Sequence, residues 1–339
     1  MGFSLFSRIT PHDKFIKAIF SSSFTENFFS IFNKTNYNKL TESFSDFDDD
    51  NPVFDLFIRT VIRNPLLTNT EQTALTINEL CKAIQGNSLT FNIVIFDNCY
   101  MQTVDTIYSL AASNIAEYII APQTSIHWRG YDYSVFNLLD RKIDDAFCIS
   151  FCKASYDNLV AFSESRQDKN IAEIAISGIN VKKASDFFKA TNNLIIAVYN
   201  ILAGHNAQVS GVLMATAIDL ALKKAKDVTR KPDGKGLGIE LFDICVLFKL
   251  IVEKINNTDL NNQFKEFLTH YNKIVVCREA SAYFKPNTTG ASICFPKTLD
   301  LDHPNQYYYY FIKEGAQIKS QFADANWDDL LNLYYSEYE

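Results

Sequence analysis

The sequence predicts an α/β fold with a mostly parallel central sheet, because two short apolar runs alternate with helical patterns. The first run, Ile93–Phe96, leads directly into Asp97-Asn98-Cys99, and a helical pattern follows from about Met101 to Ala112. The second run is Tyr118–Ala121. Short uninterrupted apolar runs are typical of strands buried on both faces. A strand, a helix and a strand in this order favour a parallel pair joined by a right-handed crossover.

Two helices are predicted before the first of these strands. Asn51 and Pro52 are typical of an N-cap and a first helical residue, and apolar residues recur with helical spacing from Phe54 to Ile62. Thr76 and Glu79 have the spacing of a capping box, a reciprocal pair of hydrogen bonds at a helix start.

The second half of the chain is predicted to continue with further helices and strands. Helical patterns are found at residues 184–202, 211–227, 242–255 and 327–331. Strands are predicted at residues 273–278 and 290–296, with a further strand or strand edge at 146–151 or at 171–176.

The composition indicates one large domain with a full core. Hydrophobic residues make up 47% of the 339, and glycine (11) and proline (8) are scarce, which argues against disorder and long linkers. We expect one compact domain over residues 51–339. Residues 1–50, which end in an acidic stretch, are expected to be an N-terminal extension or a degenerate first unit.

Charge and cysteine content exclude several classes of partner. The net charge is -7 and no basic stripe is present, so a nucleic-acid partner is not expected. The seven cysteines contain no CxxC pair, so neither a zinc site nor a disulfide framework is indicated, and we expect no metal and no cofactor. The N-terminus has no signal-peptide pattern and no apolar run is long enough to cross a membrane, so we expect a cytoplasmic protein without a membrane partner.

Several motifs resemble those of the clostripain-type cysteine peptidases. Phe96–Met101 resembles the family's Asp-Ala-Cys-Leu-Met signature, and Leu75–Leu80 is similar to its Leu-Thr-x-x-Glu-Leu helix start. Later, Gly290–Pro296 is similar to Gly-Leu-Ser-Ile-Tyr-Phe-Pro, and Trp327–Leu330 to the closing Trp-x-x-Phe-Leu. The shared order runs from about residue 75 to the end. The resemblance implies a caspase-like three-layer α/β sandwich and an ancestral activity that cuts proteins after Lys or Arg.

The resemblance implies a role for two residues at the end of the first strand. Cys99 takes the place of the nucleophile, and a helix beginning there would favour its thiolate form. Asp97 takes the place of the acid that receives a Lys or Arg side chain, with which a carboxylate can pair. Without the resemblance, Asp97 and Asn98 can equally be a helix-capping pair.

The general base of such a peptidase is missing from its usual place. The family supplies it as a His-Gly pair at the end of the preceding strand, whereas no histidine lies between His12 and Cys99. If residues 54–62 are that strand, Val61 and Ile62 replace the pair. If residues 52–63 are instead the helix before that strand, the strand is reduced to about Leu66–Thr68 and its catalytic tip is absent. Either alignment also removes the glycine N–H that helps to bind the oxyanion.

His127 is the one histidine predicted to lie near Cys99, on the loop after the second strand, and it is the candidate substitute base. The leading hypothesis is a catalytically degenerate homologue that acts as a binding or regulatory protein. Its expected partner is a protein or basic peptide, with an active paralogous peptidase as one candidate. The alternative is an active cysteine endopeptidase that cuts after Lys or Arg, with Cys99 as nucleophile. A third reading is a small-molecule-binding α/β protein unrelated to peptidases.

Overall fold

The computed structural model describes most of the chain from residue 77 onward. The described residues are 2–6, 77–86, 90–127, 130–131, 142–230, 240–296, 322 and 326–338. The predicted helix starts at Asn51 and Thr76 and the proposed boundary between residues 50 and 51 lie outside them, so these stay predictions.

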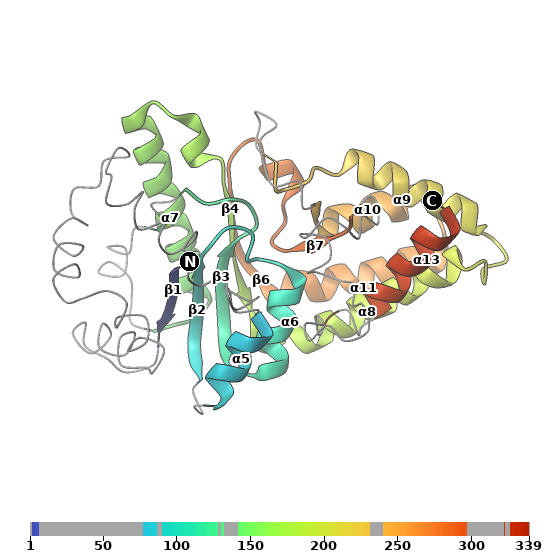
Figure 1. Cartoon of the computed structure of the whole chain (residues 1–339), viewed down its shortest axis with the longest axis horizontal. Coiled ribbons are helices and arrows are strands. Elements are labelled where there is room, and N and C mark those ends of the chain that lie inside the picture. Colours follow the sequence, from blue (N-terminus) through green and yellow to red (C-terminus); the bar gives the residue numbers. More distant parts are fainter. Residues whose placement is uncertain are drawn as a thin grey trace, which may run out of the picture. The chain divides into compact units, whose positions relative to one another are not determined.

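The central sheet has the strand order β1-β2-β3-β4-β6 (Figure 1). Its strands are β1 (Gly2–Phe6), β2 (Phe91–Asp97), β3 (Ala116–Pro122), β4 (Ala175–Asn180) and β6 (Val275–Ala280). Strands β2 and β3 are parallel, as predicted, while β1, β4 and β6 each pair antiparallel to a neighbour. Strands β2, β3 and β6 therefore run in one direction and β1 and β4 in the other. The predicted α/β class is confirmed, and the sheet is mixed.

The position of the helix before β4 explains why β4 runs in the opposite direction to β3. Helix α7 (Asp145–Arg166) begins beside the start of β3, where the Tyr118 hydroxyl donates a 2.9 Å hydrogen bond to Asp145. Lys183, just after β4, lies 3.8 Å from the same carboxylate. Helix α7 thus begins at the end of the sheet where β3 starts and β4 finishes, and it leads the chain into β4 from the end at which β3 finishes.

Helix α7 also corrects one sequence prediction. Residues 146–151 are not a strand but the first turns of this helix, whose N-cap Asp144 accepts a 3.1 Å hydrogen bond from the Phe147 N–H. The buried side chains Phe147, Cys148, Phe151 and Cys152 recur at helical spacing, which a short window does not distinguish from a buried strand. The alternative at 171–176 is partly correct, because β4 begins at Ala175.

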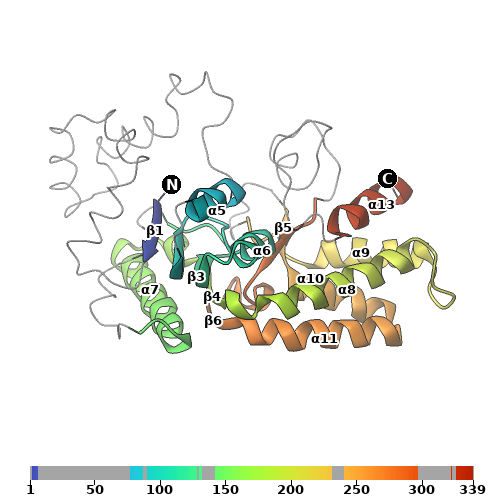
Figure 2. The same cartoon turned by 90° about the horizontal axis from the view of Figure 1, so that it is seen from below.

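Alternation of side chains along the strands creates three layers. On β2, Val94 and Phe96 face one apolar cluster, whereas Ile93 and Ile95 face another. The second cluster lies under α7. The first is covered by helices α5 (Ile77–Gly86) and α6 (Val104–Ser113), which lie on the opposite side of the sheet from α7 (Figure 2). This is the predicted three-layer sandwich.

The remaining helices pack around a small second sheet. Strands β5 (Leu241–Asp243) and β7 (Ser292–Cys294) are antiparallel. The helices are α8 (Ala184–Leu202), α9 (Gly211–Lys224), α10 (Ile244–Ile255), α11 (Thr258–Ile274) and α13 (Asp328–Tyr338). The small sheet contacts the segment that follows β2: the Ser292 N–H of β7 donates a 2.9 Å hydrogen bond to the Gln102 carbonyl. Among the helices that the structure describes, none has both the length and the apolar character needed to cross a membrane.

Candidate functional site

The C-terminal end of β2 carries both predicted site residues. The strand is buried from Ile93 to Phe96, Asp97 is half-buried, and Cys99 is exposed in the turn that follows. The change from buried to exposed within three residues results from the strand leaving the sheet at this point. A thiol that reacts with an external substrate needs such access.

The turn after β2 corrects the expectation that a helix begins at Cys99. Tyr100 has a left-handed backbone with φ of 62°, and helix α6 begins only at Val104. The N-cap is Thr103, whose Oγ1 accepts a 3.1 Å hydrogen bond from the Thr106 N–H. Asp97 and Asn98 are therefore not a helix-capping pair. The positive end of a helix is also not at the sulfur, so the effect of a helix dipole on the Cys99 thiol that the sequence predicted is absent.

The main chain of the loop after β3 contacts the Cys99 sulfur directly. The Ile126 N–H lies 3.4 Å from Sγ and donates to it, and the thiol in turn donates to the Ile126 carbonyl at 3.6 Å. Two further bonds hold the two segments together: the Tyr100 N–H donates to the Thr124 carbonyl at 3.0 Å, and the Gln102 N–H to the Pro122 carbonyl at 3.1 Å. These contacts hold the cysteine turn and the sulfur against the residues that follow β3.

His127 follows the residue that touches the sulfur. Its main chain is therefore one peptide unit from the Cys99 contact, while its imidazole packs against the Phe162 ring of α7 with a centroid distance of 5.6 Å. The other described histidines lie elsewhere: His205 follows α8, and His270 on α11 has its Nδ1 3.9 Å from a carboxylate oxygen of Asp186. His12 and His303 are outside the described residues.

Gly130 closes the loop against the carboxylate of Asp97. Its N–H donates a 2.9 Å hydrogen bond to the His127 carbonyl, and its φ of +67° is in the left-handed region. A Cβ at this position would lie 2.1 Å from Oδ2 and 2.5 Å from Oδ1 of Asp97. Only glycine fits here, because any side chain would displace the carboxylate. Two residues after β3 thus contact the predicted site: Ile126 touches Cys99 and Gly130 touches Asp97.

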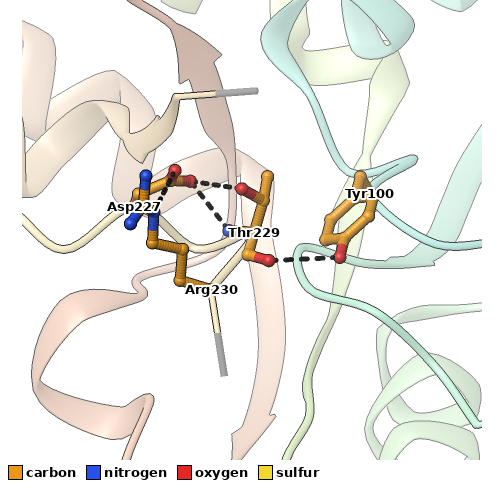
Figure 3. A network of polar contacts seen from close by, with 4 residues as sticks. All are labelled: Tyr100, Asp227, Thr229 and Arg230. Carbon is orange, nitrogen blue, oxygen red and sulfur yellow. Dashed lines mark hydrogen bonds and ion pairs between the residues drawn. The ribbon is translucent and has the colours of Figure 1, made fainter. Parts of the chain in front are cut away.

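Tyr100 connects the cysteine turn to a segment more than a hundred residues away (Figure 3). Its hydroxyl donates a 3.4 Å hydrogen bond to the Thr229 carbonyl. Asp227 holds Thr229 in place by accepting from its N–H at 2.9 Å and from its Oγ1 at 2.7 Å, and it also lies 3.6 Å from Nε of Arg230. Burial raises the pKa of Tyr100 to about 12. Sequence reasoning missed this contact, because no local pattern links Tyr100 to Thr229.

The buried carboxylate of Asp243 is hydrogen-bonded to the residue that follows β3. Asp243 accepts hydrogen bonds from Nε2 of Gln123 at 3.0 Å and from the Thr289 hydroxyl at 2.7 Å, and it caps α10 through the Cys245 and Val246 N–H groups. Gln123 is the first residue after β3, so this contact fixes the base of the loop that touches Cys99. Burial raises the pKa of Asp243, and these hydrogen bonds oppose the increase.

Within the part of the chain that the structure describes, no group of three or more His, Cys, Asp or Glu side chains is arranged to hold a metal ion. The chemistry available at the end of β2 is that of a thiol, a carboxylate and main-chain donors. This combination suits recognition of a cationic side chain beside a potential nucleophile.

Comparison with known proteins identifies a family over most of the chain. The family model described as the clostripain family matches residues 67–334. A cysteine protease of B. fragilis is similar in structure, with a TM-score of 0.51 and 15% identity over 77% of this chain and 96% of that one. A secreted cysteine protease of Bacteroides thetaiotaomicron has a TM-score of 0.51 and 16% identity over 74% of this chain and 59% of that one. At this identity the structures demonstrate a common fold. No curated protein matches the chain.

Proposed function

Because the chain belongs to the clostripain family, we propose that it is a catalytically degenerate member that binds Lys- or Arg-containing protein segments without cutting them. The observation that carries this proposal is the pairing of an exposed Cys99 and a nearby Asp97 with a stretch of sequence, residues 13–98, that contains no histidine. The family match also excludes the reading as an α/β protein unrelated to peptidases.

Loss of the base removes the step that makes a cysteine peptidase fast. A cysteine needs a neighbouring base to take its proton and to return a proton to the leaving amine. The missing glycine N–H removes one oxyanion donor as well, worth about 2.7–4 kcal/mol of transition-state stabilisation. Binding of the substrate side chain requires neither group.

The carboxylate of Asp97 supplies the recognition. A charge-assisted hydrogen bond between a carboxylate and a guanidinium or ammonium group is about twice as strong as a neutral one. The net charge of -7 adds a weak general attraction for basic segments. A partner with an accessible Lys or Arg, such as an active paralogous peptidase or its substrate, fits this site.

An active endopeptidase that cuts after Lys or Arg is the second candidate. The observation in its favour is the contact between the Ile126 main chain and the Cys99 sulfur, because it brings His127 within one peptide unit of that contact. In this case Cys99 is the nucleophile, His127 the base, and rotation of the imidazole away from Phe162 precedes catalysis.

One experiment on the purified full chain separates the two candidates. A fluorogenic peptide with Lys or Arg before the scissile bond is offered to the protein and to the variants Cys99→Ala and His127→Ala. The binding proposal expects no turnover above the level of Cys99→Ala. Turnover that both substitutions abolish would establish the endopeptidase instead.

Binding is measured in parallel by fluorescence anisotropy. A labelled Lys-containing peptide is compared with the same peptide in which norleucine replaces Lys, and each is tested on the protein and on Asp97→Asn. The proposal expects tighter binding of the Lys peptide and loss of that preference in Asp97→Asn. Equal binding of the two peptides by the unsubstituted protein would contradict it.

A further inference from the structure

A group of positive charges faces solvent where α9 leads towards β5, in a protein whose net charge is -7. The segment from Lys223 to Arg230 contains four cationic residues and one acid, Asp227. The side chain of Asp227 is only 6% exposed, whereas that of Arg230 is 57% exposed. Lys223, Lys224 and Lys226 are exposed as well. The surface of this segment is therefore positive, because its one carboxylate is turned inward.

The tertiary structure adds a fifth cation to this group. The Arg230 N–H donates a 3.1 Å hydrogen bond to the Asp227 carbonyl, and this turn brings Arg230 back towards Lys226. The Lys226 ammonium lies 4.2 Å from the centre of the Tyr283 ring, on the connection between β6 and β7. Lys285, which is exposed, follows two residues later in a short 3₁₀ helix. We call these five cations the basic patch: Lys223, Lys224, Lys226, Arg230 and Lys285.

The cations of the basic patch are available to a partner. Elsewhere on the surface, Lys153 and Lys183 lie 2.8 and 3.8 Å from carboxylate oxygens. Within the residues that the structure describes, no lysine of the basic patch has a carboxylate within ion-pair distance. Arg230 approaches Asp227 through Nε, at 3.6 Å. Because a guanidinium has five N–H donors, Arg230 retains donors for a second carboxylate.

Tyr100 connects the basic patch to the proposed binding site. Tyr100 follows Cys99, and its hydroxyl donates a 3.4 Å hydrogen bond to the carbonyl of Thr229, the residue before Arg230. Figure 3 shows Thr229 between Tyr100 on one side and the pair of Asp227 and Arg230 on the other. An extended chain spans about 3.3–3.6 Å per residue. A short segment bound at the cysteine turn therefore reaches the patch.

We propose that the basic patch binds an acidic stretch of the same partner whose Lys or Arg is held at Asp97. This inference rests on the proposed function and names the class of partner more closely. The partner is a protein segment in which carboxylates lie a few residues from a basic side chain. Complementary charges of this kind select the partner and speed its association.

The size of the basic patch favours a short acidic peptide over a nucleic acid or a membrane. A long polyanion extends beyond five cations, onto a protein whose net charge of -7 repels it. Proteins that bind single-stranded nucleic acid stack bases on exposed aromatic rings. The Tyr283 ring beside the patch already carries the Lys226 ammonium.

Fluorescence anisotropy on the full chain tests the proposal with a set of related peptides. The parent peptide contains one Lys and, a few residues away, a run of Glu. In one control peptide Gln replaces every Glu, and in another norleucine replaces Lys. The parent should bind at least about threefold more tightly than the Gln peptide, because each exposed ion pair contributes about 1.4- to 5-fold.

A patch variant and a matched control locate the effect. The patch variant removes three exposed charges and should lose the preference for Glu over Gln: Lys224→Gln, Lys226→Gln and Lys285→Gln. The control removes three exposed charges from α10 and α11 and should keep that preference: Lys254→Gln, Lys265→Gln and Lys273→Gln. Because both variants have the same net charge, the general field of the protein cancels in the comparison.

The peptides also separate failure of the basic patch from failure of the Asp97 site. Equal binding of the Glu and Gln peptides, with the preference for Lys over norleucine intact, would overturn the inference and leave the proposed function standing. A preference for Glu without any preference for Lys would support the patch and overturn the proposed function. The choice of partner would be overturned if a single-stranded oligonucleotide or an anionic vesicle bound through the patch and the Glu peptide did not.

Discussion

The carboxylate of Asp97 lies against the Cα of Gly130, at the place that a Cβ would occupy. This relationship joins the end of β2 to the loop after β3. It fixes the orientation of the acid that we propose to bind Lys or Arg. The same loop touches the Cys99 sulfur through Ile126, so displacement of Gly130 is expected to disturb both groups.

Substitution of Gly130→Ala should weaken binding of a Lys-containing peptide by about 10–100-fold, the loss expected for one charge-assisted hydrogen bond. The new methyl would lie 2.1 Å from Oδ2 of Asp97 and force the carboxylate to move. Fluorescence anisotropy measures the change in affinity.

Gly204→Ala is the matched control for backbone strain. Gly204 also has a positive φ, of +76°, but nothing lies within 4 Å of the place of its Cβ. Gly204→Ala should lose about 1–2 kcal/mol of stability through backbone strain alone and Gly130→Ala at least as much, whereas only Gly130→Ala should lose affinity. An equal loss of affinity in the two would mean that the contact with Asp97 is not the cause.

Cys99 should be the first thiol to react with iodoacetamide in the folded protein at pH 8, because it is exposed. Burial raises the pKa of Cys81, Cys148, Cys152 and Cys294, and that of Cys245 to about 12, so these thiols stay protonated. Mass spectrometry of the time course should find one rapid modification, which is absent from Cys99→Ser. Rapid labelling of Cys245 in the folded state would show that its burial is not maintained in solution.

Tyr100 should make stability fall at high pH. Burial raises its pKa in the folded protein from 10.0 to about 12. The folded state therefore keeps this proton longer than the unfolded state does. Its contribution to stability is complete below pH 10 and is lost as the pH rises from about 10 to about 12.

Urea midpoints at pH 9 and pH 11 measure this effect. The unsubstituted protein should lose more stability between these pH values than Tyr100→Phe, which cannot ionise. Other tyrosines contribute equally to both proteins and cancel in the comparison. Identical losses would mean that Tyr100 is not buried at Thr229 in solution.

Asp243→Ala should destabilise the fold by at least about 3 kcal/mol, because several buried donors lose their acceptor and each costs about 1–3 kcal/mol. These donors include Nε2 of Gln123 and the N–H and hydroxyl of Thr289. Chemical denaturation measures the loss. Asp259→Ala, at an exposed position in the first turn of α11, is the control and should change stability by less than about 1 kcal/mol.

Sequence patterns within a short segment predicted those helices and strands whose formation depends on residues close together in the chain. The apolar run before Asp97 predicted β2, and helical periodicity predicted α8 over residues 184–202. The Asn256 C-cap and the start of α11 were not predicted. The strand predicted at 146–151 is helical. Phe151 and Cys152 lie four residues after Phe147 and Cys148, so all four side chains are buried on one face of a helix.

The sequence by itself determined the α/β class, the resemblance to the clostripain family, and the placement of Asp97 and Cys99 at the end of a buried strand. These follow from the order of side chains along a short segment. The tertiary structure alone decided that β4 runs antiparallel to β3, that Ile126 and Gly130 contact the two site residues, and that the Cys277 sulfur and the Cβ of Cys148 meet beside Gly178. The physical reason is that such contacts depend on the path of the connections between elements. That path is set by packing among residues distant in the chain, and local periodicity does not encode it.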